Sequence, residues 1–342
     1  MSLALPISSP LFGVLVPAIK VKRVLVTKTA INRFVFVAIV AILAGCASLD
    51  RQAPGELAPP PEPIELADVP FFPQTEHQCG PAALATVLAW SGVETDAETL
   101  SPQLYIPARE GTLQHEIVAQ ARQHDRLAYQ IPAEPQALLA ELAAGNPVLV
   151  LQNLGLNWLP YWHYAVVVGY DPEADHFILR SGTHKRHTTA RRTFDRTWAR
   201  SNRWAIVAVE PTEVPASAAP SSYLAAAFEL EQAGRVDAAQ HAYRSGLKHW
   251  PNEPNLALAL GNSYYSDGDV DMAIDIYQHA IARGAYSGPL YNNLATALAE
   301  REQWAAAEAA ARSAIALNDA HREHYRKTLT TIRCRQSNSC QP

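Results

Sequence analysis

The 342-residue chain lacks several features on which common functions depend. It has only four cysteines, Cys46, Cys79, Cys334 and Cys340, and no glycine-rich loop of the kind that cradles phosphate. After Cys46 it has no apolar run long enough to span a membrane. We therefore do not expect a complete ATP-driven exporter.

Positive charge is also sparse. Residues 1–45 hold five of the 28 Lys and Arg residues and no Asp or Glu, which leaves 23 basic against 33 acidic residues, a net charge of −10, in the rest of the chain. Nucleic-acid binding needs a dense basic face, so no nucleic-acid partner is expected. Apolar residues at 48% and charged residues at 18% are typical of globular proteins, and the length predicts about two domains.

Residues 1–45 have the pattern of an export signal. Basic residues precede the short apolar run Phe34–Ala44, which is too short for a comfortable membrane span. Leu43-Ala44-Gly45-Cys46 resembles a bacterial lipobox, which implies lipidation of Cys46; an ordinary signal peptide is the alternative. Ala47 resembles the residue found in lipoproteins sorted to the outer membrane. The expected location is therefore the cell envelope, lipid-anchored in the outer membrane and facing the periplasm.

Composition divides the rest of the chain. Residues 46–68, rich in Pro, Ala and Glu, predict an extended tether, and residues 211–222 predict a second linker. Between them, residues 69–210 predict an α+β domain. Its expected helices cover residues 80–90, 112–124 and 135–143, and its expected strands cover residues 147–152, 164–170, 177–180 and 204–210.

A 34-residue period runs through the C-terminal region. It relates Gly234 to Gly268, Ala239 to Ala273, and Tyr243 to Tyr277. This spacing of small residues resembles tetratricopeptide (TPR) repeats, with a generic Ala-rich helical bundle as the alternative. We expect an all-α solenoid of about three repeats over residues 223–335, closed by a helix at 320–333 and followed by a tail at 336–342. The resemblance implies a groove that docks a protein partner.

Cys79 is the candidate nucleophile. Cys46 is assigned to the anchor, and Cys334 with Cys340 could form a local disulfide, which leaves Cys79 unpaired. It directly precedes a predicted helix whose first turn contains Pro81, and the positive end of a helix stabilises a thiolate. The alternative is a buried cysteine that only packs against the core.

His163 is the candidate base. Strand alternation places it on one face with Ala165, Val167 and Gly169, where small side chains would let a helix approach closely. We therefore expect that His163 meets Cys79.

Three segments, Val69–Gln74, Cys79–Leu84 and His163–Tyr170, together resemble the C39 peptidases and their C39-like relatives, known as leader-cleaving domains of bacteriocin exporters. The resemblance implies a papain-like fold in which Cys79 is the nucleophile and His163 the general base. It also implies that Gln74, with the backbone N–H of Cys79, binds the oxyanion. Residues 177–183 lack the family's orienting carboxylate, so either the third role is missing and a Cys–His dyad acts alone, or Ser181 or Asp171 fills it.

Together these features predict a membrane-anchored periplasmic cysteine peptidase whose TPR array docks substrate or a partner protein. One alternative is a catalytically inactive, peptide-binding scaffold lipoprotein, and another is a Cys–His enzyme that transfers or removes acyl groups elsewhere than at peptide bonds. The basic, His-containing stretch at residues 184–192 lacks metal-ligand spacing and predicts an exposed hairpin. No metal or organic cofactor is expected.

Overall fold

The computed structural model describes residues 60, 62–74, 78–109, 111–337 and 339, all of which fall within one compact unit, residues 54–342. The predicted signal segment, the predicted lipidation site Cys46, most of the predicted tether and Cys340 lie outside the described residues. Cys334 is disulfide-bonded. Within the described ranges, no helix combines the length and the apolar character needed to cross a bilayer.

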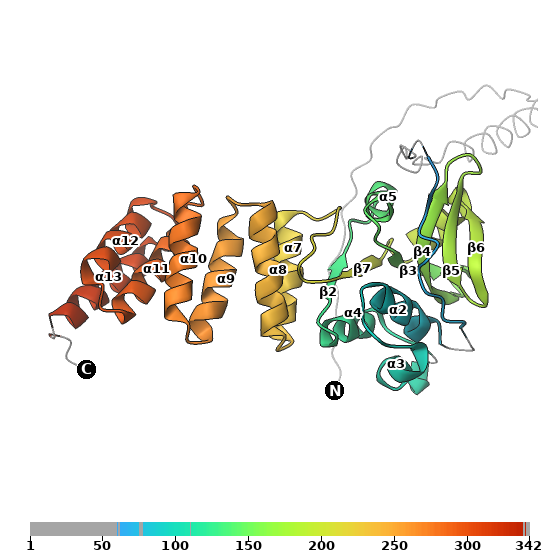
Figure 1. The fold of residues 1–342 in the computed structure, drawn as a ribbon, viewed down its shortest axis with the longest axis horizontal. Helices are drawn as coiled ribbons and strands as arrows, with labels where there is room; N and C mark the ends of the chain where they lie inside the picture. Colours follow the sequence, from blue (N-terminus) through green and yellow to red (C-terminus); the bar gives the residue numbers. More distant parts are fainter. Residues whose placement is uncertain (1–59, 61, 75–77, 110, 338, 340–342) are drawn as a thin grey trace, which may run out of the picture. The chain divides into compact units, whose positions relative to one another are not determined.

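The N-terminal domain is built on a seven-stranded antiparallel sheet (Figure 1). The strand order is β2-β7-β3-β4-β5-β6, and β1 pairs with β4. The strands are β1 (Ile64–Glu65), β2 (Leu127–Gln130), β3 (Val148–Asn153), β4 (Trp162–Asp171), β5 (His176–Ser181), β6 (His184–Ala190) and β7 (Ala205–Val209). The basic stretch predicted as a hairpin forms β6, which makes a hairpin with β5, and the first two residues of α6; the side chains of β6 are mostly exposed.

Five helices accompany the sheet, which confirms the α+β class. They are α2 (Cys79–Trp90), α3 (Ala97–Leu104), α4 (Gln114–Gln123), α5 (Pro135–Ala143) and α6 (Arg191–Ala199), and a short 3-10 turn, η2, covers Pro107–Arg109. Side chains of α2 and α4 pack with Tyr164, Val166 and Val168 of β4 in one buried cluster. Side chains of α5 and α6 pack with Ala165 and Val167 in the other.

The face on which the cysteine helix packs differs from the one predicted. Ala165 and Val167 were expected to receive that helix, but they belong to the cluster that contains Phe194 and Trp198 of α6. The small side chains leave room for these aromatic rings. The α2 helix packs on the opposite face of β4.

The folded domain starts earlier than the expected boundary at residue 69. Ile64 and Glu65, assigned to the tether, form β1 and pair with Tyr170 and Gly169. Gly169 is required there because a Cβ would collide with the carbonyl oxygen of Ile64. The buried Arg180 guanidinium then donates to the backbone oxygens of residues 67 and 69 at 2.9 and 3.1 Å.

The C-terminal region consists of seven helices: α7 (Pro220–Gln232), α8 (Val236–His249), α9 (Pro254–Ser266), α10 (Val270–Ala282), α11 (Gly288–Glu300), α12 (Trp304–Ala316) and α13 (Arg322–Gln336). They form three helix pairs and a final helix, which is consistent with the helical solenoid predicted from the 34-residue period. Ala239, Ala273 and Ala307 are fully buried. Gly261 packs against the ring of Tyr277, where a Cβ would not fit. Small residues therefore permit close helix packing.

The second predicted linker is a packed connection. The fully buried carboxylate of Glu141 in α5 accepts hydrogen bonds from the backbone N–H groups of Ala216 at 3.2 Å and Ser217 at 2.8 Å. The hydroxyl of Tyr129 in β2 hydrogen-bonds to Ser222 at 2.9 Å. Residues of both regions belong to one buried apolar cluster. Composition alone predicted a linker because it carries no information on such long-range contacts.

Candidate active site

Cys79 lies at the first position of α2. The helix begins here without a side-chain cap at Gln78, and Pro81 occupies its first turn, where the missing N–H costs no helical hydrogen bond. Gly80 is needed because a Cβ at this position would lie 2.6 Å from the Cβ of Thr112. The side chain of Thr112 thus packs directly on the backbone beside the thiol.

The environment of the thiol raises its pKa, and burial is the largest cause. The backbone of Tyr164, and to a smaller extent that of residues 79 and 80, acts in the opposite direction and lowers the pKa. The thiolate stabilisation expected from the helix N-terminus is therefore present but smaller than the cost of desolvation. Cys79 is a neutral thiol at neutral pH.

His163 is held by Ser181. Its Nε2 lies 2.9 Å from the Ser181 hydroxyl at the end of β5. Burial, with a smaller effect from His187, lowers the pKa of the imidazole to about 4. The ring is therefore neutral at neutral pH and can accept a proton.

Ser181, of the two candidates for the third position, is the residue that contacts His163. Asp171 is the last residue of β4, at the end opposite His163. Its carboxylate accepts backbone hydrogen bonds from Glu173 and Ala174, each at 3.0 Å. Asp171 thus stabilises the turn into β5.

Gln74 lies beside the same stretch of β4. Its side-chain oxygen accepts from the N–H of Gly182 at 3.0 Å, and its backbone N–H donates to the Gly182 carbonyl, also at 3.0 Å. Its Nε2 donates to the carbonyl of Tyr164 at 3.3 Å. An amide nitrogen carries two hydrogens, so one remains for a further acceptor.

The residue that sequence reasoning missed is Tyr164. Its N–H binds the Cys79 sulfur and its carbonyl binds Gln74, because β5 ends at Ser181 and leaves this edge of β4 unpaired. Its hydroxyl donates to the carbonyl of Thr112 at 3.2 Å. The only signal in the sequence is its position next to His163. The peptide groups of Tyr164 bring together the elements that carry Cys79, Gln74 and His163.

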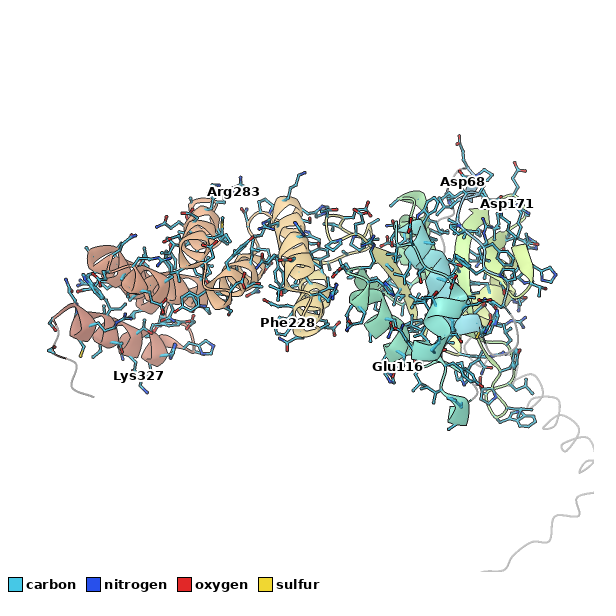
Figure 2. All side chains as sticks on the ribbon, turned by 60° about the horizontal axis from the view of Figure 1, so that its bottom comes forward. Asp68, Glu116, Asp171, Phe228, Arg283 and Lys327 are labelled. Atoms are coloured by element: carbon cyan, nitrogen blue, oxygen red, sulfur yellow. The ribbon has the colours of Figure 1, made fainter. Side chains whose placement is uncertain are left out.

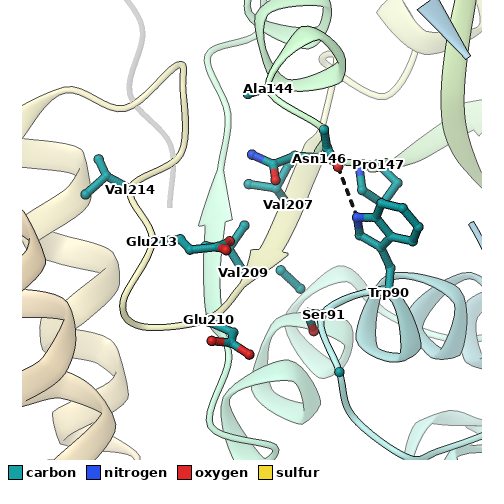
Figure 3. Close-up of a pocket in the computed structure, with 13 residues that line it drawn as sticks. Trp90, Ser91, Ala144, Asn146, Pro147, Val207, Val209, Glu210, Glu213 and Val214 are labelled. Atoms are coloured by element: carbon teal, nitrogen blue, oxygen red, sulfur yellow. Dashed lines mark hydrogen bonds between the residues drawn. The ribbon is translucent and has the colours of Figure 1, made fainter. Parts of the chain in front are cut away.

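A cavity of about 560 Å³ lies elsewhere, at the C-terminal ends of α2 and α5 (Figure 3). Trp90, whose ring N–H donates to the Gly145 carbonyl at 3.0 Å, lines it together with Glu210 and Glu213. Cys79 starts the helix that Trp90 ends, so the two are separated by about 16 Å along the axis of α2. This cavity therefore lies apart from the Cys79 site.

The described part of the chain contains no group of three or more His, Cys, Asp or Glu side chains placed to hold a metal ion. Residues 66–206 match the model of the Peptidase_C39 like family. No curated protein matches the chain.

Two solved structures are similar to parts of the chain. One is a protein from Bacillus anthracis assigned as a C39-like peptidase, with 18% identity over 43% of this chain and 98% of that chain and a TM-score of 0.38. The other is the Yersinia enterocolitica type III secretion chaperone SycD in complex with a peptide of the translocator YopD. It has 18% identity over 35% of this chain and 90% of that chain, with a TM-score of 0.30.

Proposed function

We propose that this protein is a cysteine peptidase that cleaves a polypeptide through Cys79 and His163, because residues 66–206 match the model of the Peptidase_C39 like family. The observation that carries the proposal is the convergence on one short stretch of β4. The sulfur of Cys79 and the amide of Gln74 both bind the peptide groups of Tyr164, the residue that follows the Ser181-held His163 in β4.

The mechanism starts from a neutral pair. When His163 donates Nε2–H to the Ser181 hydroxyl, its Nδ1 lone pair is free to accept the proton of the Cys79 thiol. The sulfur attacks the amide carbon as that proton moves, so a pre-formed thiolate is not needed. Ser181 thus acts as a positioning residue that selects the reactive tautomer.

Two hydrogen-bond donors can stabilise the negative charge that develops on the substrate oxygen. These are the second N–H of the Gln74 side chain and the backbone N–H of Cys79. The protonated His163 then gives its proton to the leaving amine and the C–N bond breaks. Water, deprotonated by His163, hydrolyses the thioester and restores the thiol.

We further propose that the helical array docks the substrate or a partner protein. Leu224 and Phe228 of α7 and Leu258 of α9 line a mainly apolar hollow of about 430 Å³, and Phe228 is half exposed (Figure 2). The proposed lipid anchor at Cys46 and a periplasmic location on the outer membrane rest on the sequence pattern of residues 1–47. Mass spectrometry of the peptide that begins at Cys46, from envelope preparations, tests the anchor.

Cleavage is tested by incubating the full chain with envelope proteins and identifying new peptide termini by mass spectrometry. We expect new termini that disappear with Cys79→Ala and with His163→Ala. They should persist with Asp171→Asn, the matched control on β4, the strand that carries His163. Termini that persist with Cys79→Ala would contradict the proposal.

A specific observation favours a second candidate, an inactive peptide-binding domain. Both pKa shifts keep the thiol and the imidazole uncharged, and a hydroxyl stands where the family has a carboxylate. In that case no new termini form, and wild type and Cys79→Ala retain the same partner protein. If the protein instead transfers or removes acyl groups at other bonds, a thioester should form on Cys79 and no new peptide termini should appear.

A further inference from the structure

The loop between β3 and β4 presents an unusual concentration of exposed apolar side chains. Trp158 is 79% exposed, Tyr161 66% and Leu159 63%, and Leu154, Leu156 and Trp162 are each about half exposed. No Asp, Glu, Lys or Arg occurs from Val148 to Tyr170. A contiguous apolar group of this size on a protein surface indicates an interaction site.

Hydrogen bonds within the loop make it a closed hairpin. The N–H of Leu154 donates to the Tyr161 carbonyl at 2.8 Å, and Leu156 and Leu159 exchange backbone hydrogen bonds at 3.0 and 3.1 Å. Below them the Asn153 side-chain oxygen accepts from two backbone N–H groups, those of residues 155 and 161. The backbone therefore holds the apolar side chains outward and prevents their collapse onto the domain.

A cationic helix lies at the base of this hairpin. Arg200, which follows α6, donates to the carbonyls of Asn153 at 3.2 Å and Gly155 at 2.6 Å. Arg192 and Arg196 are exposed on α6 at successive spacings of four residues from Arg200, which places all three on one side of the helix. The one acidic residue of this helix, Asp195, is buried.

A hollow of about 490 Å³ lies at the base of the hairpin, lined by Asn153, Asn157, Trp162, Ala199 and Arg200. The most exposed apolar side chains, Trp158, Leu159 and Tyr161, do not line this hollow, so it does not explain their exposure. Trp, Tyr and Leu on a projecting element, with arginines alongside, match the interfacial layer of a bilayer that carries anionic headgroups.

We propose that residues 154–162 insert into the interface of an anionic lipid bilayer, with Arg192 and Arg196 against the headgroups. This contact depends neither on lipidation of Cys46 nor on catalysis by Cys79. Because Trp162 directly precedes His163, this contact would place the start of β4 at the membrane surface.

The test measures tryptophan fluorescence of the full chain carrying Cys46→Ala, mixed with vesicles of phosphatidylglycerol and dibrominated phosphatidylcholine. Bromine quenches only indoles that reach the acyl region, and residues 1–59 contain no tryptophan. We expect strong quenching that is lost in the double variant Trp158→Phe with Trp162→Phe. The quenching should persist in Trp90→Phe, the matched control at the end of α2 opposite Cys79.

Two further variants test affinity. Leu159→Ser should weaken vesicle binding at least tenfold, whereas Tyr286→Ser, similarly exposed on the helical array, should leave it unchanged. Arg192→Gln with Arg196→Gln should weaken binding to anionic vesicles by about an order of magnitude. Quenching that survives the double tryptophan variant would overturn the proposal. So would a Leu159→Ser variant that binds vesicles normally but loses self-association or polypeptide binding.

Discussion

The sheet domain and the helical array differ in the distance along the chain over which their key contacts form. In the array, buried small residues such as Gly261 pack against side chains of the next helix, here Tyr277. In the sheet domain, Gln74 contacts Tyr164 and Gly182, which lie 90 and 108 residues later. A local period therefore specifies the array, whereas the candidate active site depends on correct assembly of the whole sheet.

The two regions nevertheless share a core. The buried carboxylate of Glu141 binds the connecting segment, and ion pairs join Asp125 to Arg235 and Arg122 to Glu229. Because exposed ion pairs contribute little, most of the coupling comes from the buried carboxylate and the apolar cluster.

Removal of the Glu141 carboxylate is the strongest way to separate the regions. Glu141→Ala leaves the N–H groups of Ala216 and Ser217 without their acceptor, and we expect a loss of about 3 kcal/mol in the free energy of unfolding. Urea unfolding followed by circular dichroism should change from one transition to two. Glu213→Ala, a carboxylate on the same connection, is the control, and a single unchanged transition in Glu141→Ala would show that the regions are coupled by other contacts.

Acid should weaken the sheet domain selectively. His163 has a pKa of about 4 in the folded protein and about 6.5 when unfolded, so the unfolded state binds more protons between these values. The free energy of unfolding should therefore fall as the pH drops from 6.5 to 4, by up to about 3 kcal/mol. Below pH 4 the imidazole is protonated in both states, so His163 should cause no further change. His163→Asn should flatten this slope in urea titrations, while His241→Asn, exposed on α8, should not. Equal slopes in wild type and His163→Asn would contradict the buried neutral imidazole.

Overpacking should affect the array selectively. Ala307 is fully buried in α12, and Ala307→Leu should cost about 2 kcal/mol because the neighbouring helices must move apart. Ala309→Leu, exposed on the same helix, is the control. Thermal unfolding measures the cost, and alkylation of Cys79 should be unaffected in both variants. A change in Cys79 reactivity with Ala307→Leu would mean that the array controls the geometry of the site.

The smallest expected effect concerns Ser181. If it selects the tautomer of His163, Ser181→Ala should lower kcat about tenfold, equivalent to about 1.4 kcal/mol, with little change in KM. Ser181→Thr should retain the hydroxyl and most of the activity. Steady-state rates on a peptide identified from the new termini provide the measurement. If Asp171→Asn and Ser181→Ala lowered kcat equally, the loss would reflect a general disturbance of the sheet and no specific role of Ser181 in selecting the tautomer of His163.

Much of the fold could be predicted from local sequence. The helix at Pro135–Ala143 matches its prediction, as do the strands around residues 148–153 and 205–209 within one or two positions. Helix α3 and strand β2 were not predicted, because α3 contains an internal proline, Pro102, and β2 has only four residues.

The candidate site was only partly predictable. The sequence identified Cys79, His163 and Gln74, but the choice between Ser181 and Asp171 required the registers of β4 and β5. The raised pKa of Cys79 and the lowered pKa of His163 arise from burial, which depends on tertiary packing. The face on which α2 packs was predicted wrongly because alternation defines two faces without saying which helix covers each.

The shared core between the sheet domain and the helical array has a consequence for any polypeptide held by both. Because a buried carboxylate holds the connection at Ser217, the region that carries the hollow at Phe228 is joined through a buried core to the domain that carries Cys79. A chain anchored at the first point would then reach the second only after a set number of residues. The position of the cleaved bond would then depend on the number of substrate residues between the docked segment and Cys79, as well as on the side chains at that bond.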